Sequence, residues 1–371
     1  MSLPGDAPSQ LVPHTRKIAV LRANALGDFI FSLPALYALR AAYPKAEIVL
    51  LGKAWHADFL ESRPGPVSRV AVVPRWRGVS QPDTWTGQTA ADSAAADRFF
   101  AQMAAEGFDL ALQMHGGGRH SNPFVQRLGA RVTAGLRSPD ATPLDRWVRY
   151  EYFQHEALRL IEVARLVGAP PVMIEPRIEV THRDRVESCE VVPEQARPLA
   201  ILHPGASDPR RRWPVENFAA VGDALAREGY TVAVIGIDAE RQIVDAVIEN
   251  MQQPALNLCG LLSLHALTGL IARAELVIAN DSGPRHLAEA VGTPTVGIYW
   301  CGNGINAGSV FREFHRPHLS WRLNCPVCGR DTIYDNCDHQ VPFVDLVRVD
   351  EVLQSALDIL KMRHDRKTAP R

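Results

Sequence analysis

The 371-residue sequence predicts an α/β protein made of two Rossmann-like domains, each built on a parallel sheet. The first observation is length, because a chain of this size exceeds what one hydrophobic core usually supports. The second is the alternation of short β-branched runs with longer helical stretches, which is typical of βαβ units. The third is that this alternation restarts after residue 198, so that two halves of similar size share the chain.

The first half contains apolar runs with the length and composition of buried strands. They occupy residues 17–21, 47–51, 70–73 and 110–113. A helix is expected over residues 33–42, after a turn that contains glycine. Another is expected over 158–167, because Gly168 and the two prolines beyond it form a stop signal. Residues 176–198 are charged and poorly periodic, and we expect the strand-like end of the first domain there, followed by a linker.

The second half repeats the architecture without repeating the sequence. Strands are expected at residues 199–202, 231–235, 276–279 and 295–298. Helices are expected at residues 215–227, 239–250, 264–272, 284–291 and 351–361. The resulting domains cover residues 15–190 and 197–350, with a closing helix at 351–363 and flexible tails at 1–14 and 364–371.

Composition narrows the classes of function. A formal net charge of -1 argues against bulk nucleic-acid binding. The first 16 residues are polar and lack the apolar segment of a signal peptide, and no apolar run is long enough to span a bilayer. Six cysteines in a chain this long do not form a disulfide scaffold. We therefore expect a cytoplasmic, reducing location.

Polar loops follow several of the predicted strands. They lie at residues 22–28, 203–212, 236–240 and 280–285. Because ligands of doubly wound sheets bind beyond the carboxyl ends of the strands, these loops predict a site in the cleft between the two domains.

The loop at 280–285 opens a helix whose first turn suits Pro284. The candidate residues for donor binding in this segment are Asp281, Ser282, Gly283, Arg285 and His286. The free amides of a helix N-terminus form a ready anion site, and a diphosphate is the natural guest. The alternative is that Asp281 and Ser282 only cap the helix.

The loop at 203–212 carries three successive arginines, Arg210 to Arg212. Their planar groups suit phosphate oxygens, Gly205 allows the backbone close to a ligand, and Ser207 supplies a hydroxyl. A solvated basic loop is the alternative, although Trp213 and the proline after it attach the loop to the next helix.

The first loop ends in Gly27 and Asp28, at the start of a helix, without the GxGxxG fingerprint of dinucleotide-binding domains. Asp28 could cap that helix and interact favourably with its dipole, or project into the cleft as a general base.

A cysteine cluster lies near the carboxyl terminus. Its four potential ligands are Cys325, Cys328, Cys337 and His339. A CxxC pair followed by Cys-x-His suits tetrahedral zinc, or iron, in a structural role. Three reduced thiols in a surface loop are the alternative.

Three segments together resemble glycosyltransferase family 9, the ADP-heptose:lipopolysaccharide heptosyltransferases. They read RANALGDFIFSLPAL, HPGASDPRRRWPVENF and VIANDSGPRHLAEAVGTPTVGIY, and the likeness extends over residues 18–360. The resemblance implies a GT-B fold, in which two Rossmann-like domains face each other across a central cleft. The acceptor would bind the amino-terminal domain and the nucleotide-sugar the carboxy-terminal one.

The resemblance also implies an inverting, metal-independent reaction that needs no cofactor. Asp28 would take the proton from the acceptor hydroxyl, and Arg211 and Arg212 would bind the diphosphate. The Asp281–Gly283 turn would hold phosphate and sugar, and Glu240 is the best match to an acidic residue that binds the ribose. Helix amides and arginines can stabilise a leaving diphosphate in place of a metal ion.

The expected reaction moves heptose from ADP-heptose to a lipopolysaccharide-core or related acceptor, at the cytoplasmic face and with peripheral membrane contact. The sequence indicates no nucleic-acid partner and leaves the oligomeric state open. The Arg-Arg pair departs from the lysine common in the family, and the cysteine cluster resembles the iron-binding motif of relatives that modify proteins. A transferase acting on protein or another glycan, or a nucleotide-binding module without catalysis, are the alternatives. An NAD-dependent oxidoreductase is disfavoured by the missing glycine fingerprint.

Overall fold

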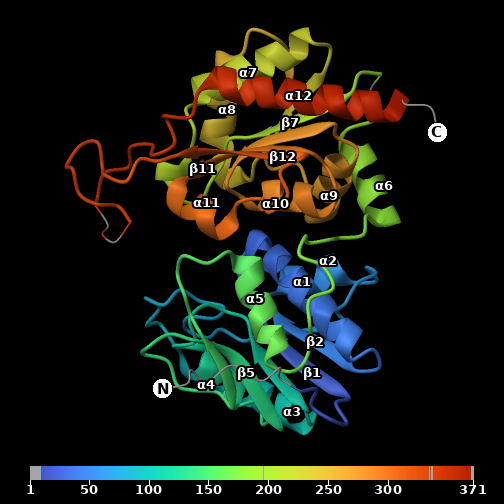
Figure 1. Ribbon diagram of the computed structural model, residues 1–371, viewed down its shortest axis with the longest axis vertical. Coiled ribbons are helices and arrows are strands. Elements are labelled where there is room, and N and C mark those ends of the chain that lie inside the picture. Colours follow the sequence, from blue (N-terminus) through green and yellow to red (C-terminus); the bar gives the residue numbers. More distant parts are fainter. Residues whose placement is uncertain (1–9, 195, 334, 336, 369–371) are drawn as a thin grey trace. The chain divides into compact units, whose positions relative to one another are not determined.

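The computed structural model describes residues 10–194, 196–333, 335 and 337–368, and the chain divides into two compact units. The first unit spans Met1–Pro176 and the second Arg177–Arg371 (Figure 1). Each contains a six-stranded sheet in which every pairing is parallel, in the orders β3-β2-β1-β4-β5-β6 and β12-β11-β10-β7-β8-β9. Both are the doubly wound order of nucleotide-binding domains. The predicted fold class, α/β with two Rossmann-like domains, is confirmed.

The first unit contains the four predicted strands and two more, at residues 132–137 and 146–149, that the sequence did not predict. Its strands are β1 (Lys17–Leu21), β2 (Glu47–Gly52), β3 (Arg69–Val72), β4 (Leu110–Gln113), β5 (Val132–Arg137) and β6 (Arg146–Arg149). Its helices are α1 (Leu26–Ala42), α2 (Ala54–Leu60), α3 (Ala90–Ala105), α4 (Ser121–Gln126) and α5 (Glu156–Arg165). The helix expected over 33–42 begins earlier, at Leu26, because the Asp28 carboxylate accepts a hydrogen bond from the Ala25 amide and completes the first turn.

The second unit has the same plan. Its strands are β7 (Leu199–His203), β8 (Thr231–Val234), β9 (Ala255–Asn257), β10 (Leu276–Asn280), β11 (Thr295–Trp300) and β12 (His315–Ser320). Its α-helices are α6 (His182–Val191), α7 (Val215–Arg227), α8 (Arg241–Asn250), α9 (Leu264–Ala272), α10 (Gly283–Ala290), α11 (Cys301–Ala307) and α12 (Val349–Thr368). Two 3-10 turns, η1 (Pro209–Arg211) and η2 (Asp238–Glu240), precede α7 and α8.

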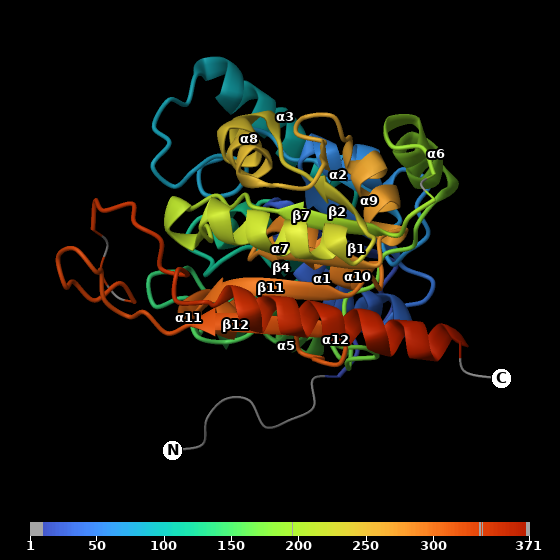
Figure 2. The same cartoon turned by 90° about the horizontal axis from the view of Figure 1, so that it is seen from above.

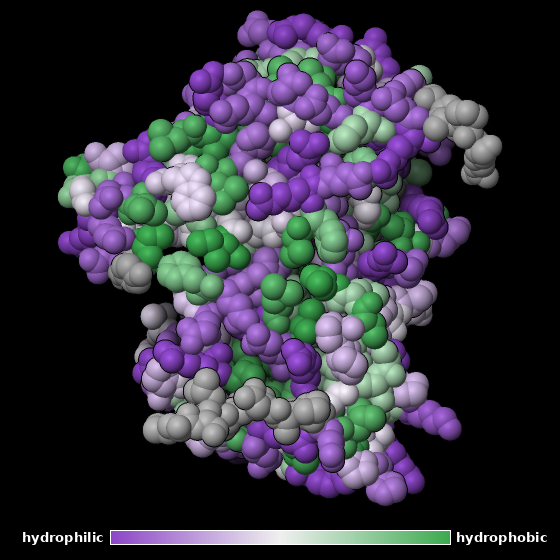
Figure 3. Space-filling model, viewed as in Figure 1, coloured by the Kyte–Doolittle hydropathy of each residue, from purple (hydrophilic) through white to green (hydrophobic). Residues whose placement is uncertain are grey.

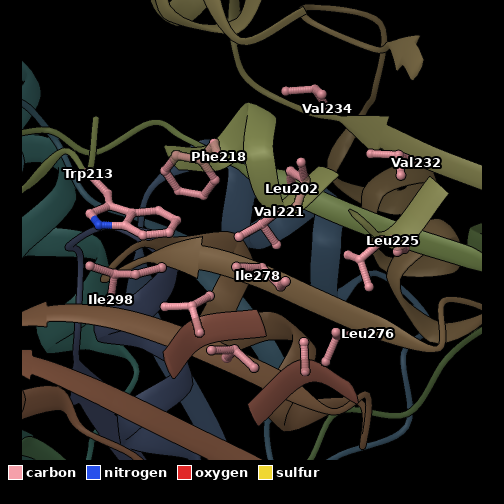
Figure 4. Packing of buried hydrophobic residues seen from close by; sticks show 14 of the residues in the cluster. Leu202, Trp213, Phe218, Val221, Leu225, Val232, Val234, Leu276, Ile278 and Ile298 are labelled. Atoms are coloured by element: carbon pink, nitrogen blue, oxygen red, sulfur yellow. The ribbon is translucent and has the colours of Figure 1, made fainter. Parts of the chain in front are cut away.

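Helices cover both faces of the second sheet. In Figure 1, α7, α8 and α12 lie on one face and α9, α10 and α11 on the other, and Figure 2 shows α7 and α12 running along the same face. Alternate residues of the strands point into the core beneath α7, as Figure 4 shows for Leu202, Ile278 and Ile298. Trp213 and Phe218 pack edge to face there, with ring centroids 5.2 Å apart. This core holds the end of the arginine loop against the sheet.

Residues 176–198 differ from the expected linker. They contain α6, which packs on α9 within the second unit. The packing is close, because a Cβ on Gly269 of α9 would lie 2.0 Å from the Asp184 backbone oxygen. A buried pair, Asp184 Oδ1 and His265 Nδ1 at 2.6 Å, joins the two helices. The sequence concealed α6 because it is strongly polar and has little helical periodicity.

The described parts of the expected tails are ordered. Val12 is buried, and its amide donates to the Tyr43 hydroxyl at 3.0 Å. At the other end α12 reaches Thr368, so residues 364–368 are helical. Residues 1–9 and 369–371 of the predicted tails lie outside the described residues.

The surface mixes hydrophilic and hydrophobic residues (Figure 3). Apolar side chains are exposed in the loop after β12, including Leu323 and Val327. In the part of the chain that the structure describes, every helix is too short or too polar to cross a bilayer.

Candidate functional site

Most of the predicted donor residues gather at the carboxyl ends of β7 and β10, which are neighbours in the second sheet. The loop after β7 carries the arginines, and the turn after β10 begins α10. This is the point where the strand order reverses, at which doubly wound sheets bind ligands. The topology therefore brings together segments about 70 residues apart in sequence, as in the hydrogen bond from Arg211 to Asp281.

Asp281 links the two segments. Its Oδ2 accepts from Arg211 Nη1 at 3.1 Å, and its Oδ1 lies 3.0 Å from His286 Nε2. Burial acts to raise the pKa of Asp281, but the hydrogen bond from His286 and the charges of Arg211 and Arg285 outweigh it, and the pKa lies below its usual value. Asp281 is therefore a buried, ionised carboxylate that holds one arginine of the loop.

The three successive arginines have different partners. Arg210 forms hydrogen bonds to both oxygens of Asp208, with its Nη2 2.7 Å from Oδ2. Arg211 binds Asp281 and donates from Nη2 to the Ser207 hydroxyl at 2.8 Å. Arg212 donates from Nε to the Ala206 carbonyl at 2.9 Å. Arg210 therefore binds a residue of its own turn. The Arg211 side chain instead reaches Asp281, which lies just before α10.

A second series of polar contacts joins the same loops through His203, the last residue of β7. His203 Nε2 lies 3.3 Å from Glu240 Oε2, and its Nδ1 lies 2.9 Å from the Ser282 hydroxyl. A carboxylate only accepts, so we assign the proton to Nε2, and Ser282 then donates to Nδ1. Sequence reasoning missed His203, although its place at the end of a strand that enters the predicted site was a usable signal.

Glu240 lies in η2, after β8, and its Oε2 accepts from the Ile237 amide at 3.1 Å. Burial acts to raise the pKa of Glu240, but hydrogen bonds from His203 and Ile237 and the charge of Arg212 keep it below its usual value. Gly205 leaves room for this carboxylate, because a Cβ there would lie 2.0 Å from Glu240 Oε1. The glycine is therefore required by a side chain of its own unit.

The first turn of α10 has no side-chain cap. Ser282 is its N-cap, but the Ser282 side chain forms no capping hydrogen bond to the helix and binds His203 instead. Gly283, at the first helical position, is half-buried. The N-terminal amides of such a helix favour an anion.

Arg285 turns inward, away from the place predicted for it. Its side chain is fully buried, with Nη1 3.1 Å from Glu289 Oε2 and 2.9 Å from the Ser309 hydroxyl. Among the described residues, the guanidinium is joined to Asp281 by hydrogen bonds through His286, whose Nδ1 lies 2.5 Å from Nη2.

Asn280, the last residue of β10, holds both loops in place. Its Oδ1 accepts from the Trp213 amide at 3.1 Å, and its Nδ2 donates to the Pro204 carbonyl at 2.7 Å. Trp213 Nε1 in turn donates to the Val347 carbonyl at 2.9 Å. Asn280 stood in the predicted loop, but its sequence position gave no sign of this role.

In the first unit, Asp28 lies at the carboxyl end of β1, the equivalent switch point of the other sheet. Its side chain is 40% exposed. Oδ2 accepts from the Ala25 amide at 3.3 Å and Oδ1 from Arg22 Nη2 at 3.2 Å. The cap and the exposed carboxylate therefore coexist, and the helix-cap interpretation does not exclude a role toward a ligand.

Arg22 is the buried centre of this cluster, and sequence reasoning missed it. Its other hydrogen bonds go to the Met114 carbonyl at 2.6 Å, the Asp28 carbonyl at 2.8 Å and Glu156 Oε1 at 2.9 Å. Nearby, His115 accepts the Ala23 amide on Nδ1 at 3.2 Å. Burial, with the charge of Arg22, lowers the pKa of His115 to about 3, so the imidazole is neutral.

The cysteine cluster is assembled in the loop between β12 and α12. One ligand atom from each of Cys325, Cys328, Cys337 and His339 lies within 4.8 Å of the others, so these residues could hold a metal ion. Gly329, with φ of +71°, closes the turn after the CxxC pair. Among the described residues, the buried His339 Nδ1 has no hydrogen-bond partner. The backbone amide of Cys328 is the main cause that lowers the pKa of Cys325 to about 6, which favours the thiolate that metals bind.

The cysteine loop returns to the arginine loop. After the cluster, the Phe343 amide donates to the Arg210 carbonyl at 2.7 Å, and the Arg210 guanidinium lies 5.4 Å from the centre of the Phe343 ring. The cysteine loop and the arginine loop are therefore in direct contact in the second unit.

Comparison with known proteins gives a consistent result. The sequence model of glycosyltransferase family 9 (heptosyltransferase) matches residues 97–304, which include all the predicted donor residues and begin after Asp28. The lipopolysaccharide core heptosyltransferase OpsX of Haemophilus influenzae is 24% identical over 299 residues, covering 76% of this chain and 79% of that protein. Lipopolysaccharide heptosyltransferase 2 of Salmonella typhimurium is 26% identical over 304 residues, covering 76% and 82%.

Solved structures show the same fold. A family 9 glycosyl transferase from Veillonella parvula has a TM-score of 0.75 at 22% identity, over 94% of this chain and 97% of that one. The ADP-heptose lps heptosyltransferase II of E. coli has a TM-score of 0.71 at 18% identity, over 94% and 99%. TibC, an iron-containing dodecameric glycosyltransferase of enterotoxigenic E. coli, has a TM-score of 0.57 at 15% identity, over 95% and 78%. The fold is therefore that of GT-B heptosyltransferases.

Proposed function

The chain belongs to glycosyltransferase family 9, and from that premise we propose that it transfers a heptosyl group from ADP-heptose to a lipopolysaccharide-core acceptor. The observation that carries the proposal is the meeting of Arg211, Asp281 and the uncapped first turn of α10 at the switch point of the second sheet. This arrangement offers cationic donors and free amides to one diphosphate.

The donor would be held by the second unit. Arg211, Arg212 and the amides after Ser282 would bind the diphosphate, which carries the negative charge that develops as the sugar departs. Glu240, fixed by His203, would accept hydrogen bonds from the ribose hydroxyls. The buried ionised carboxylate of Asp281 would act mainly on Arg211 and border the sugar.

The acceptor would be activated by the first unit. Asp28 would take the proton of the acceptor hydroxyl as its oxygen bonds to the anomeric carbon. The bond from that carbon to the diphosphate oxygen breaks at the same time, and its electron pair leaves with ADP. Attack opposite to the leaving group inverts the configuration. Arg22 would hold the carboxylate of Asp28 in place.

The cysteine cluster would hold zinc or iron in a structural role. Its fit rests on four convergent ligand atoms and on the unpartnered His339 nitrogen among the described residues. Such an ion would close the loop and supply no step of the transfer. The name of TibC, which calls that protein iron-containing, makes iron the first metal to examine.

A glycolipid acceptor would place the enzyme against the cytoplasmic face of a membrane. The cysteine cluster favours a second candidate, in which the same donor chemistry acts on a protein acceptor. Both candidates would use the same donor loops and would differ in the acceptor that they bind.

The test is direct. Purified protein is screened by thermal shift against ADP-, UDP- and GDP-sugars and then incubated with ADP-heptose and heptose-deficient lipopolysaccharide. We expect stabilisation by ADP-sugars, ADP release, and a gain of one heptose in the mass spectrum of the acceptor. Stabilisation only by a different nucleotide would contradict the donor, and transfer only to protein would favour the second candidate.

A further inference from the structure

A line of buried polar contacts runs behind the arginine loop. It passes from Arg285 to His286, from His286 to Asp281, and from Asp281 to Arg211, with separations of 2.5, 3.0 and 3.1 Å. Arg285 and His286 are almost wholly inaccessible to solvent, whereas the Arg211 side chain is 20% exposed. This series of contacts therefore extends from the buried Arg285 to Arg211, which lies at the surface where the donor is proposed to bind.

We propose that His286 and Arg285 are positioning residues, which fix the orientation of Arg211 through Asp281 and thereby set the affinity for the donor diphosphate. The inference rests on the proposed donor site, and it gives an indirect role to two residues that the sequence predicted to bind the donor.

The chemistry of the side chains decides which group donates and which accepts in each of these hydrogen bonds. A guanidinium only donates, so His286 Nδ1 must accept from Arg285. The single proton of the neutral ring is then on Nε2, where it points at the Asp281 carboxylate. Burial, and next the charge of Arg285, lower the pKa of His286, which agrees with a neutral ring. Neutral His286 therefore donates to Asp281 without removing its charge.

Asp281 passes this constraint to the loop. With Oδ1 bound by His286, Oδ2 is directed at Arg211 Nη1, while Arg211 Nη2 is held by Ser207. Two contacts on different nitrogens fix the plane of a guanidinium. The remaining N–H groups of Arg211 then keep one direction, which lowers the conformational entropy lost when a phosphate binds.

Arg285 is itself rigidly held. Besides Glu289 and Ser309, its Nη2 donates to the Ala307 carbonyl at 3.2 Å, and its guanidinium lies 5.1 Å from the centre of the Tyr299 ring. Gly297 leaves space for it, since a Cβ there would lie 3.0 Å from Arg285 Cδ. The two terminal nitrogens of Arg285 are therefore held by several partners at the inner end of the line.

The experiment is a double-mutant cycle on ADP binding, measured by calorimetry on the full chain. Arg211→Ala is combined with His286→Leu, which keeps bulk but removes both ring nitrogens. His286→Gln is the conservative variant, because an amide can accept from Arg285 and donate to Asp281. The matched control is His265→Leu, which breaks another buried histidine–aspartate pair of the same unit.

We expect Arg211→Ala and His286→Leu each to raise the dissociation constant for ADP roughly tenfold or more. Together they should exceed the larger single effect by less than about threefold, because both act through the same guanidinium. His286→Gln should restore most of the affinity. His265→Leu should lower the melting temperature without changing the affinity.

Two results would overturn the inference. Multiplicative effects of the two substitutions would mean that His286 supports the fold generally, and unchanged affinity in folded His286→Leu would mean that it does not act on the site. If His286→Leu does not fold, failure of His286→Gln to bind more tightly than His286→Ala decides against the inference. If the single substitution Arg211→Ala leaves the affinity for ADP unchanged, this result would refute the proposed donor site and the inference with it.

Discussion

The substitution Gly205→Ala tests the proposed contact of Glu240 with the ribose separately from the proposed contact of Arg211 with the diphosphate. The new Cβ would lie 2.0 Å from Glu240 Oε1 and 2.3 Å from Cδ, whereas ordinary contact begins near 3.4 Å. The carboxylate must therefore retreat by about 1.4 Å, the difference between 2.0 and 3.4 Å. The backbone of Gly205 is not left-handed, so an alanine would not be strained by its backbone conformation.

The retreat breaks the contacts that hold Glu240. Its Oε2 now lies 3.3 Å from His203 Nε2 and 3.1 Å from the Ile237 nitrogen, and a further shift of this size exceeds hydrogen-bonding distance. A hydrogen bond from a ribose hydroxyl to a carboxylate contributes roughly 1.5–3 kcal/mol. Its loss should weaken ADP binding about 10- to 150-fold.

The assay compares two ligands by calorimetry, ADP and inorganic pyrophosphate, which has no ribose. Gly205→Ala should weaken ADP and leave pyrophosphate nearly unchanged, since Arg211 keeps its contacts with Asp281 and Ser207. Gly65→Ala is the control, because a Cβ there meets nothing within 4 Å. Equal weakening of both ligands, or unchanged ADP affinity, would refute the assignment of Glu240 to the ribose.

Three further predictions follow from other parts of the molecule. Asp28→Asn should slow transfer about a hundredfold or more while ADP-heptose affinity stays nearly intact, and unchanged turnover would reduce Asp28 to a helix cap. Elemental analysis should find close to one equivalent of metal per chain, and less in Cys328→Ser; a metal-free wild-type protein would favour plain thiols. Burial lowers the pKa of His56 to about 3, so below pH 6.5 the unfolded chain takes up a proton that the folded chain excludes. Stability should therefore fall as the pH drops from 6.5 toward 3, by up to about 1.4 kcal/mol per pH unit from this group, and an equally steep decline in His56→Gln would contradict this origin.

The apolar runs of the sequence predicted eight of the strands, including the edge strand β3, but missed β5, which is buried and lies between β4 and β6. The strand β12 escaped notice because it is polar and contains Pro317. Proline is tolerated there because β12 is an edge strand that pairs only with β11. A partly exposed edge strand needs no continuous apolar run, so the sequence of β12 resembles that of a loop.

The site was predictable as a set of loops but not as a set of contacts. Arg210, Arg211 and Arg212 are equivalent in sequence, yet each guanidinium has a different partner. Their directions depend on η1 and on Asp281, which comes from a distant strand. Arg285 follows the predicted turn, but its position on α10 directs it into the core. Such orientations are properties of the packed sheet rather than of local sequence.

The helix α6 sets the smallest fragment of the chain that contains the complete second unit. A fragment beginning at residue 197 would include every strand of the second sheet but would omit α6. The face of α9 at Gly269, on which α6 packs, would then be exposed. The buried His265 would lose its hydrogen bond with Asp184. An exchange of second units between relatives should therefore be made at Arg177, where the compact unit begins, so that α6 stays with α9, the helix on which it packs.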